Sequence, residues 1–561
     1  MVTDCYLPDE CLEAVFGCLK DNHCLEHLSL VSKRFLTTSN DFRSSLVICD
    51  LTLPFLPRLL QRFPNLTSLD LSQFHGDLDE LLTHISLFSL DLRSLNLSKG
   101  FVMPVNGLLA LKKTLISLNC SRMARLGKTN LPLILNCFPF LQELDLSYPN
   151  CYVNLELNEL SLALPKLRKI NLSGHYMSDL SLFYLCKNCE FLQEIVMIRV
   201  FHLTVEGVAS AVRERPGLRC LSFTITESAL LALELPHSLF TSSLFSLKGL
   251  TCLDLSFSCV PDKLFLSLAE ECLPLTSLGL QGCFGYTYIG IFCLLSKCQS
   301  FQHLNLQKAD FLGDQHVTRL SLFLGNLISI NIGFCSKLTE SALIALAKNC
   351  PLLTNINMEE TSIGRMSLEN PNFLMDFVVS PQVKSLHLKG NAWLRDESVH
   401  IFATFFPNLE LLDLSSCYYI FNCVGKVLRT GFNIRHLSLA SSSRAKLLEM
   451  NFAVPKLEVL NLSGSATDDD ALYAISMSCC GLLQLNLENC YDVTEKGVRQ
   501  VVEKCTKLRE INLGGCQNVA GNVVSEMVLS MPSLRKITIP PFYHPSDHER
   551  ELFLHHRCLV C

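Results

Sequence analysis

The chain has 561 residues, of which 49% are apolar and 18% charged, and 47 basic against 53 acidic residues give it a net charge of −6 at pH 7. This composition is too hydrophobic for a disordered chain, and the charge provides no basic field that would attract nucleic acid. No stretch approaches 18 consecutive apolar residues and the first ten residues lack an apolar leader segment, so we expect neither a membrane-spanning helix nor secretion.

Residues 5–42 have the apolar spacing of two short helices. Two sets of apolar residues recur at helical intervals there: Leu12, Val15, Phe16 and Leu19, then Leu28, Val31 and Phe35. Pro8 and Asp9 suit a helix start, because proline fixes φ and an acidic side chain favours the positive end of the helix dipole. A segment this short buries little core alone. We therefore expect it to cap the following repeats or to complete its core on a partner.

These residues also carry a motif. The run L-P-D-E-C-L-E-A-V-F-G-C-L, which begins at Leu7, is followed by L-S-L-V-S-K-R-F, and together they resemble the F-box. Val15 and Phe35 stand where the family often has isoleucine and tryptophan, and both keep the apolar character. The resemblance implies that the segment binds the Skp-type adaptor of an SCF-type cullin–RING ubiquitin ligase. The residues assigned to this contact are Leu7, Pro8, Leu12, Val15, Phe16, Leu19, Leu28, Val31 and Phe35.

Beyond this segment the pattern L-x-x-L-x-L recurs in 19 copies spaced by about 26 residues. The copies begin at Leu66, Leu92, Leu115, Leu141, Leu167, Leu192, Leu218, Leu250, Leu275, Phe301, Leu327, Leu353, Val383, Leu409, Ile434, Leu457, Leu482, Leu508 and Leu534. The alternation predicts a strand with one buried face, and the rest of each copy predicts a helix, with Thr339 and Thr494 as N-caps of two of them. We expect an α/β fold, a horseshoe-shaped leucine-rich-repeat solenoid.

The expected domains are an F-box over residues 1–45, the solenoid over 46–540 and a C-terminal tail over 541–561. The 28 cysteines fall mostly at the end of a predicted helix or just after a predicted strand, where a small apolar side chain fits between stacked repeats. We therefore interpret them as buried free thiols. No paired C-x-x-C block suggests zinc, and we expect no metal and no cofactor.

An F-box directly before such repeats resembles the F-box/leucine-rich-repeat family. That resemblance implies a non-catalytic adaptor in the cytoplasm, the nucleus or both, which binds a protein substrate for ubiquitination while other subunits supply the chemistry. No nucleotide-binding, hydrolase or metalloprotease motif suggests an enzyme. Two alternatives stay open: a small-molecule co-receptor similar to the plant auxin and jasmonate receptors, and an interaction scaffold outside any ligase.

The third, fifth and seventh residues of each copy face one common surface. The fifth is Asn or Asp in 13 of the 19 copies, a regularity more typical of scaffold than of a binding site. We expect substrate contacts where this pattern is interrupted and at two long intervals, one after Leu218 and one after Leu353. The candidate substrate-binding residues are Val196, Ile198, His303, Glu359, Arg365, Phe373, Phe377, His387, Lys389 and His436.

The chain ends in Cys558-Leu-Val-Cys561, which fits the C-a-a-X pattern for prenylation of Cys558, although cysteine is not a usual last residue. A single prenyl group gives only weak anchoring without a second signal. We therefore expect contact with a membrane only if Cys558 is prenylated.

Overall fold

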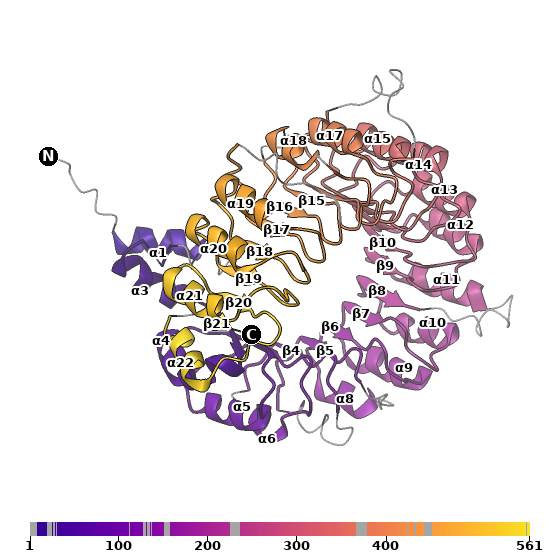
Figure 1. The fold of residues 1–561 in the computed structure, drawn as a ribbon. Helices are drawn as coiled ribbons and strands as arrows, with labels where there is room; N and C mark the ends of the chain where they lie inside the picture. Colours follow the sequence, from indigo (N-terminus) through magenta and orange to yellow (C-terminus); the bar gives the residue numbers. More distant parts are fainter. Residues whose placement is uncertain are drawn as a thin grey trace. The chain divides into compact units, whose positions relative to one another are not determined.

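The computed structural model describes residues 8–560 except 20–24, 26–27, 30, 112, 127–130, 132–134, 136, 151–156, 225–235, 366–378, 422, 431–432, 443–451 and 557. The chain forms two compact units, Met1–Phe257 and Ser258–Cys561. In each unit, short parallel strands alternate with helices along the chain (Figure 1). This alternation is the leucine-rich-repeat arrangement that the sequence predicts.

The first unit begins with two packed helices, α1 (Asp9–Gly17) and α3 (Lys33–Phe42). Its strands are β1 (Ser45–Cys49), β2 (Ser68–Gln73), β3 (Ser94–Asn96), β4 (Ser117–Asn119), β5 (Glu143–Asp145), β6 (Lys169–Asn171), β7 (Glu194–Met197), β8 (Cys220–Phe223) and β9 (Cys252–Asp254). The helices among these strands are the 3-10 helix η1 (Asp50–Phe55), then α4 (Leu56–Arg62), α5 (Leu78–Ser86), α6 (Val105–Ala110), α8 (Leu157–Ala163), α9 (Asp179–Asn188), α10 (Val205–Arg213) and α11 (Pro236–Ser246).

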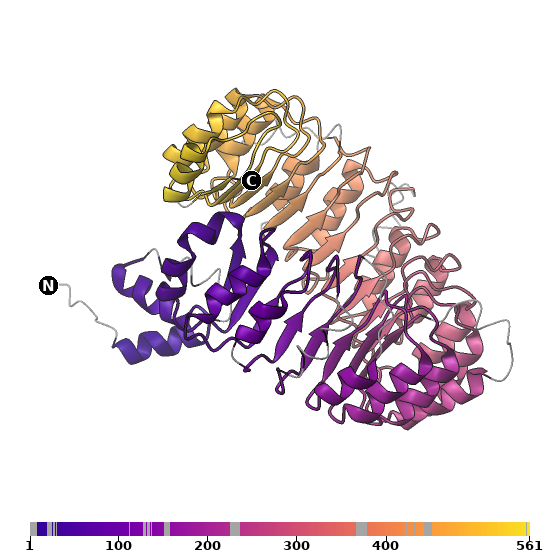
Figure 2. The ribbon, with the colours of Figure 1, turned by 90° about the horizontal axis from the view of Figure 1, so that it is seen from below.

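The second unit repeats the same alternation, and Figure 2 shows it from a second direction. Its strands are β10 (Ser277–Gly279), β11 (His303–Asn305), β12 (Ser329–Asn331), β13 (Asn355–Asn357), β14 (Ser385–His387), β15 (Leu411–Asp413), β16 (His436–Ser438), β17 (Val459–Asn461), β18 (Gln484–Asn486), β19 (Glu510–Asn512), β20 (Lys536–Thr538) and β21 (Leu559–Val560). Its helices are α12 (Asp262–Glu271), α13 (Tyr288–Lys297), α14 (Asp314–Ser321), α15 (Glu340–Asn349), α17 (Asp396–Phe405), α18 (Cys423–Thr430), α19 (Asp469–Ser478), α20 (Glu495–Lys504), α21 (Asn522–Ser530) and α22 (Asp547–His555).

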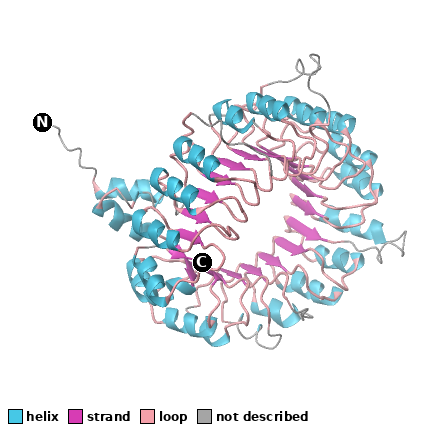
Figure 3. Ribbon diagram, viewed as in Figure 1, coloured by secondary structure: helices cyan, strands magenta, loops and turns pink. Residues whose placement is uncertain are grey.

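Neighbouring strands pair with equivalent positions opposite each other. On β11 and β12, for example, His303 pairs with Ser329 and Asn305 with Asn331. The apolar residue between them points inward, and Leu304 is 3% exposed. Figure 3 shows strands along one side and helices along the other within each unit. We call the surface made by the third and fifth residues of the copies the strand face.

Each of the 19 predicted copies contains one of the strands β2–β20, and Thr339 and Thr494 are the N-caps of α15 and α20, as predicted. The structure adds a strand at either end. β1 precedes the first predicted copy and pairs with β2. The segment predicted as a tail holds α22 and β21, and β21 pairs in parallel with β20. The strand arrangement therefore extends into residues 541–561.

Candidate functional site

The N-terminal helical pair, α1 and α3 with the intervening Leu25 and Leu28, has a small core of its own. Leu12, Phe16 and Leu25 are 3%, 1% and 6% exposed, and four half-buried residues pack against them: Leu19, Leu28, Phe35 and Phe42. The Phe16 ring lies 5.6 Å from that of Phe35 in an edge-on contact. Five of the nine residues predicted to contact an adaptor thus pack within this pair. Leu12 and Phe16 in particular are core residues rather than surface contacts, which corrects that prediction.

Three of the predicted contact residues remain on the surface of the pair. Val15 is 53% and Val31 is 63% exposed, and Pro8 is exposed as well. Val15 points away from Phe16 because consecutive helical residues are turned by about 100°. Leu7 lies outside the described residues. The exposed apolar surface of the helical pair therefore centres on Val15 and Val31.

On the strand face, the Asn or Asp at the fifth position of 13 copies stabilises the backbone just after the strand. In every one of the 13 copies, the side-chain Oδ1 of the fifth residue accepts the backbone N–H two residues later, at 2.8–3.1 Å. The third residue after the Asn or Asp commonly adopts positive φ, as Lys308 (66°) and Phe334 (59°) do. The carbonyl or carboxylate oxygen thus fixes the turn by which the chain leaves the strand. This supports the interpretation of these fifth-position residues as part of the scaffold.

Two candidates in the first unit have different surroundings. Val196 is half-buried on the strand face, between Asn171 on β6 and Ser222 on β8. Ile198 is only 8% exposed, and its backbone N–H donates to the Ser173 hydroxyl at 3.1 Å. The prediction that Ile198 lies on the exposed face is therefore wrong. Two other small seventh residues, Ser147 and Ser173, are as deeply buried, whereas the longer Lys389 at the same position of another copy is exposed.

In the second unit, the candidate histidines do not form one cluster. His303 on β11 and His436 on β16 are exposed, whereas His387 on β14 is half-buried and lies 3.0 Å from the Ser385 hydroxyl. His303 lies in register with Ser385 on β14, the third strand after β11, and His387 is two residues further along that strand. A strand spacing of about 4.8 Å and a rise of about 3.3 Å per residue therefore put His303 and His387 about 16 Å apart. Lys389 is exposed two residues beyond His387.

Glu359 contacts a residue two repeats away, and Arg365 contacts the next repeat. The amide of Gln307 donates to Glu359 Oε1 at 3.0 Å, and this contact passes over Gly333 of the intervening repeat. The Arg365 guanidinium lies over the ring of Trp393 at 5.7 Å, and that tryptophan is 47% exposed. Phe373 and Phe377, the other candidates near this point, lie outside the described residues.

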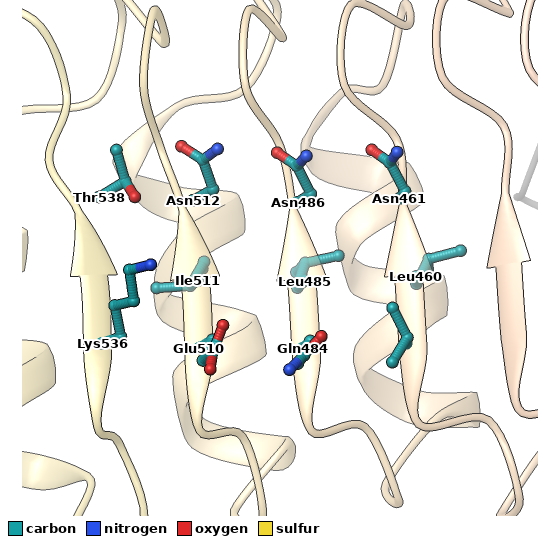
Figure 4. Close-up of a pocket in the computed structure, with 11 residues that line it drawn as sticks. Leu460, Asn461, Gln484, Leu485, Asn486, Glu510, Ile511, Asn512, Lys536 and Thr538 are labelled. Atoms are coloured by element: carbon teal, nitrogen blue, oxygen red, sulfur yellow. The ribbon is translucent and has the colours of Figure 1, made fainter. Parts of the chain in front are cut away.

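A polar pocket on the strand face was not predicted. It spans β17 to β20 and has a volume of about 300 Å³. Its polar lining residues project from neighbouring strands in two rows (Figure 4). One row is Gln484, Glu510 and Lys536, and the other is Asn461, Asn486, Asn512 and Thr538. The sequence does contain a clue to this pocket, because Glu510 and Lys536 are oppositely charged third residues of two consecutive copies. Many other copies also have a polar third residue, so the repeat pattern alone does not single out this pair.

Many of the described cysteines at helix ends and after strands are buried, as predicted, among them Cys189, Cys350 and Cys490, whereas Cys272 at the end of α12 is exposed. Burial raises the pKa of Cys350 to about 12, so it stays protonated at neutral pH. Cys558 is 1% exposed beside β21, so its thiol is reachable only when this segment opens. Among the described residues, no three His, Cys, Asp or Glu side chains gather as metal ligands, and no helix is both long and apolar enough to cross a membrane.

No protein-family model matches the chain. It is similar to a chain of the yeast Rad7 and Elc1 complex, at 18% identity and a TM-score of 0.47, over 73% of this chain and 89% of that one. It is also similar to a chain of the TLR13–ssRNA13 complex, at 14% identity and a TM-score of 0.41, over 89% and 75%. For an internalin of Listeria monocytogenes the values are 17%, 0.32, 62% and 80%. These similarities assign no partner or activity.

Proposed function

We propose that the chain is the substrate-recognition adaptor of an SCF-type cullin–RING ubiquitin ligase, working in the cytoplasm, the nucleus or both. The observation that carries the proposal is the F-box-like motif, which lies on a compact helical pair directly ahead of β1 and leaves Val15 and Val31 exposed. The pair would bind the Skp-type adaptor, and the repeats would bind the protein substrate.

In this role the chain needs no catalytic group. Holding a substrate next to a ubiquitin-loaded enzyme replaces a chance encounter by a nearly intramolecular transfer, because the tether raises the effective concentration of the substrate lysines. A scaffold of stacked repeats, each fixed to the next by strand pairing, holds such a partner in a defined position.

The substrate contact is placed on the strand face. Val196, His303, His387 and His436 stay proposals for it. So do Glu359 and Lys389, the seventh residues of their copies, and Arg365 in the segment that follows β13. The polar pocket adds Glu510 and Lys536, which offer both signs of charge side by side. Such a surface fits a substrate segment with its own paired charges, whose capture weakens as salt rises.

The small-molecule alternative, based on receptors that also hold an inositol phosphate, gains no support from Lys169 and Lys536 on the strand face. An inositol phosphate needs several converging cations. Lys169 is instead paired with Glu194 at 3.3 Å, and Lys536 lies opposite Glu510 on the neighbouring strand. The remaining alternative, a scaffold outside any ligase, is decided by the first experiment below.

The first experiment is co-purification of a Skp-type adaptor with the full chain and with Val15→Glu and Val31→Glu. A buried glutamate in the contact should cost about 2 kcal/mol or more, roughly a 30-fold loss of affinity. Leu180→Glu, at an exposed apolar position of α9 that is 59% exposed, is the matched control and should bind normally. Phe16→Ala is not a suitable variant because it removes the core of the helical pair. Unchanged binding by both test variants would contradict an adaptor contact at Val15 and Val31, and no adaptor binding by the unaltered chain would identify a scaffold outside SCF ligases.

The second experiment maps the substrate surface by affinity capture with the proteasome inhibited. One set of variants carries Val196→Glu, or His387→Glu with Lys389→Glu. Another carries the charge swap Glu510→Lys with Lys536→Glu, which keeps the local net charge. Loss of captured proteins in the first set supports the predicted site, and loss only in the charge swap moves the site to the polar pocket. Capture that is normal in all variants contradicts a strand-face site.

A further inference from the structure

Several buried cysteines of the repeats take part in the packing between neighbouring copies. Their thiols donate to carbonyl oxygens of the preceding repeat, as Cys490 does to Leu462 at 3.1 Å and Cys516 to Leu487 at 3.0 Å. Cys220 and Cys252 are different. Both are third residues of their copies, so they lie on the strand face, and both are half-buried rather than fully buried.

The two cysteines face each other across neighbouring strands. Cys220 on β8 and Cys252 on β9 are direct partners in the parallel register, and their side chains hydrogen-bond to each other. Adjacent strands lie about 4.8 Å apart. Disulfides join residues whose Cα atoms are about 4.4–6.8 Å apart, so this pair is within bonding range without a shift of the backbone.

The surroundings keep the pair reduced under ordinary conditions. The pKa of Cys220 is raised, first by the hydrogen bond with Cys252, then by burial and by the nearby Glu194 carboxylate, while a hydrogen bond with Ser222 opposes the rise. The hydrogen bond with Cys252 and the burial both disfavour a thiolate at neutral pH. Because the thiolate is also the nucleophile toward peroxide, the first oxidation of this pair is slow. Once one sulfur is oxidised, the second lies in register beside it on the next strand, and this nearness favours the disulfide.

We propose that Cys220 and Cys252 form a redox-sensitive dithiol that hydrogen peroxide converts to an intramolecular disulfide between β8 and β9. One sulfur attacks a peroxide oxygen, the O–O bond breaks and the departing oxygen leaves as water after taking up a proton, which gives a sulfenic acid. The second sulfur attacks the sulfenyl sulfur, the S–S bond forms and the S–O bond breaks with release of a second water. Two thiols lose two electrons, which reduce the peroxide.

The disulfide would alter a surface next to a candidate binding position. It would replace two S–H donors on the strand face by an apolar bridge, one strand away from Val196 on β7. It would also close a covalent loop around residues 221–251, one of the two long intervals between copies. Capture of any partner at this part of the face would then depend on oxidation. The inference stands independently of the ligase proposal, since it concerns only thiol chemistry of this chain.

The test uses the reduced full-length protein and hydrogen peroxide. After treatment, free thiols are blocked with N-ethylmaleimide and peptides are mapped by mass spectrometry. We expect a cross-linked peptide containing Cys220 and Cys252 that dithiothreitol removes, and its complete loss in Cys220→Ser and in Cys252→Ser. Cys272→Ser is the matched control, because Cys272 also touches a second thiol, that of Cys298, and this change should leave the Cys220–Cys252 link intact.

A second probe tests the geometry without oxidation. Phenylarsine oxide bridges two neighbouring thiols, so it should protect Cys220 and Cys252 together from alkylation in the wild-type chain. Protection without a peroxide-induced disulfide would overturn the redox proposal. So would oxidation that stops at sulfenic acid, or cross-links that join either cysteine to a different partner. The wild-type maps alone are decisive, even if a serine variant folds poorly.

Discussion

Glu340 is a residue whose ionisation opposes folding. It is the first residue of α15, and its side chain is fully buried. Its Oε1 accepts the backbone N–H of Gly364 at 2.5 Å, while Oε2 has no hydrogen-bond partner among the described residues. Burial raises the pKa of this carboxyl above its ordinary value, with the Asp314 carboxylate adding to the rise.

This raised pKa predicts a pH-dependent stability. A carboxyl that holds its proton more tightly in the folded state stabilises the fold below its ordinary pKa of 4.5, and the contribution is lost as pH rises through the folded pKa. Glu340→Gln keeps an acceptor for Gly364 and removes the ionisation. We expect its melting temperature to exceed that of the wild type by more at pH 8 than at pH 4 in differential scanning calorimetry. Glu397→Gln, at an exposed position in the first turn of α17, is the control. An equal difference at both pH values would contradict the argument.

At the scale of elements, a recurring bridge joins the start of one helix to the start of the next. The carboxylate of Asp469 on α19 accepts the backbone N–H of Thr494 at 2.9 Å and its hydroxyl at 2.6 Å. The same bridge joins Asp179 to Thr204, Asp262 to Thr287 and Asp314 to Thr339. Since each threonine is also the N-cap of its helix, one carboxylate fixes the cap of the neighbouring repeat.

Removing one bridge should destabilise the second unit. Asp469→Ala leaves the N–H and hydroxyl of Thr494 without their acceptor, which we expect to cost about 1–3 kcal/mol of unfolding free energy. Asp470→Ala, one position along the same helix and exposed, should change stability by no more than about 0.5 kcal/mol. Urea denaturation followed by circular dichroism measures both. Equal midpoints for the two variants would mean that the bridge adds nothing.

The sequence predicts elements better than it predicts which side chains are exposed. Apolar alternation located the strands, because a buried face needs Leu or Ile at every second position. The same alternation misplaced Ile198, since it does not reveal where the chain leaves the strand. Helical spacing grouped Val15 with Phe16, although a turn of about 100° separates the buried from the exposed side chain. The polar pocket escaped prediction because it depends on which third-position residues become neighbours on β18 to β20.

At the scale of the whole molecule, the 28 cysteines give one more prediction. Buried thiols with raised pKa values, such as those of Cys350 and Cys505, stay protonated and unreactive in the folded chain. In protein kept from peroxide, all 28 cysteines should therefore alkylate once the chain is denatured without reductant, as an intact mass would report. A population with protected pairs would contradict the interpretation of the cysteines as packing residues.

The Gln307–Glu359 contact limits how such a chain can gain or lose repeat copies during evolution. Bonds between neighbouring copies survive duplication or loss of a whole copy, because equivalent residues take over the same roles. Gln307 and Glu359, however, are 52 residues apart and meet only because Gly333 between them has no side chain in the way. An added or deleted copy at β12 would separate this pair or place a bulkier residue beneath it. Copy number should therefore be more constrained over evolutionary time between β11 and β13 than where bonds join adjacent copies alone.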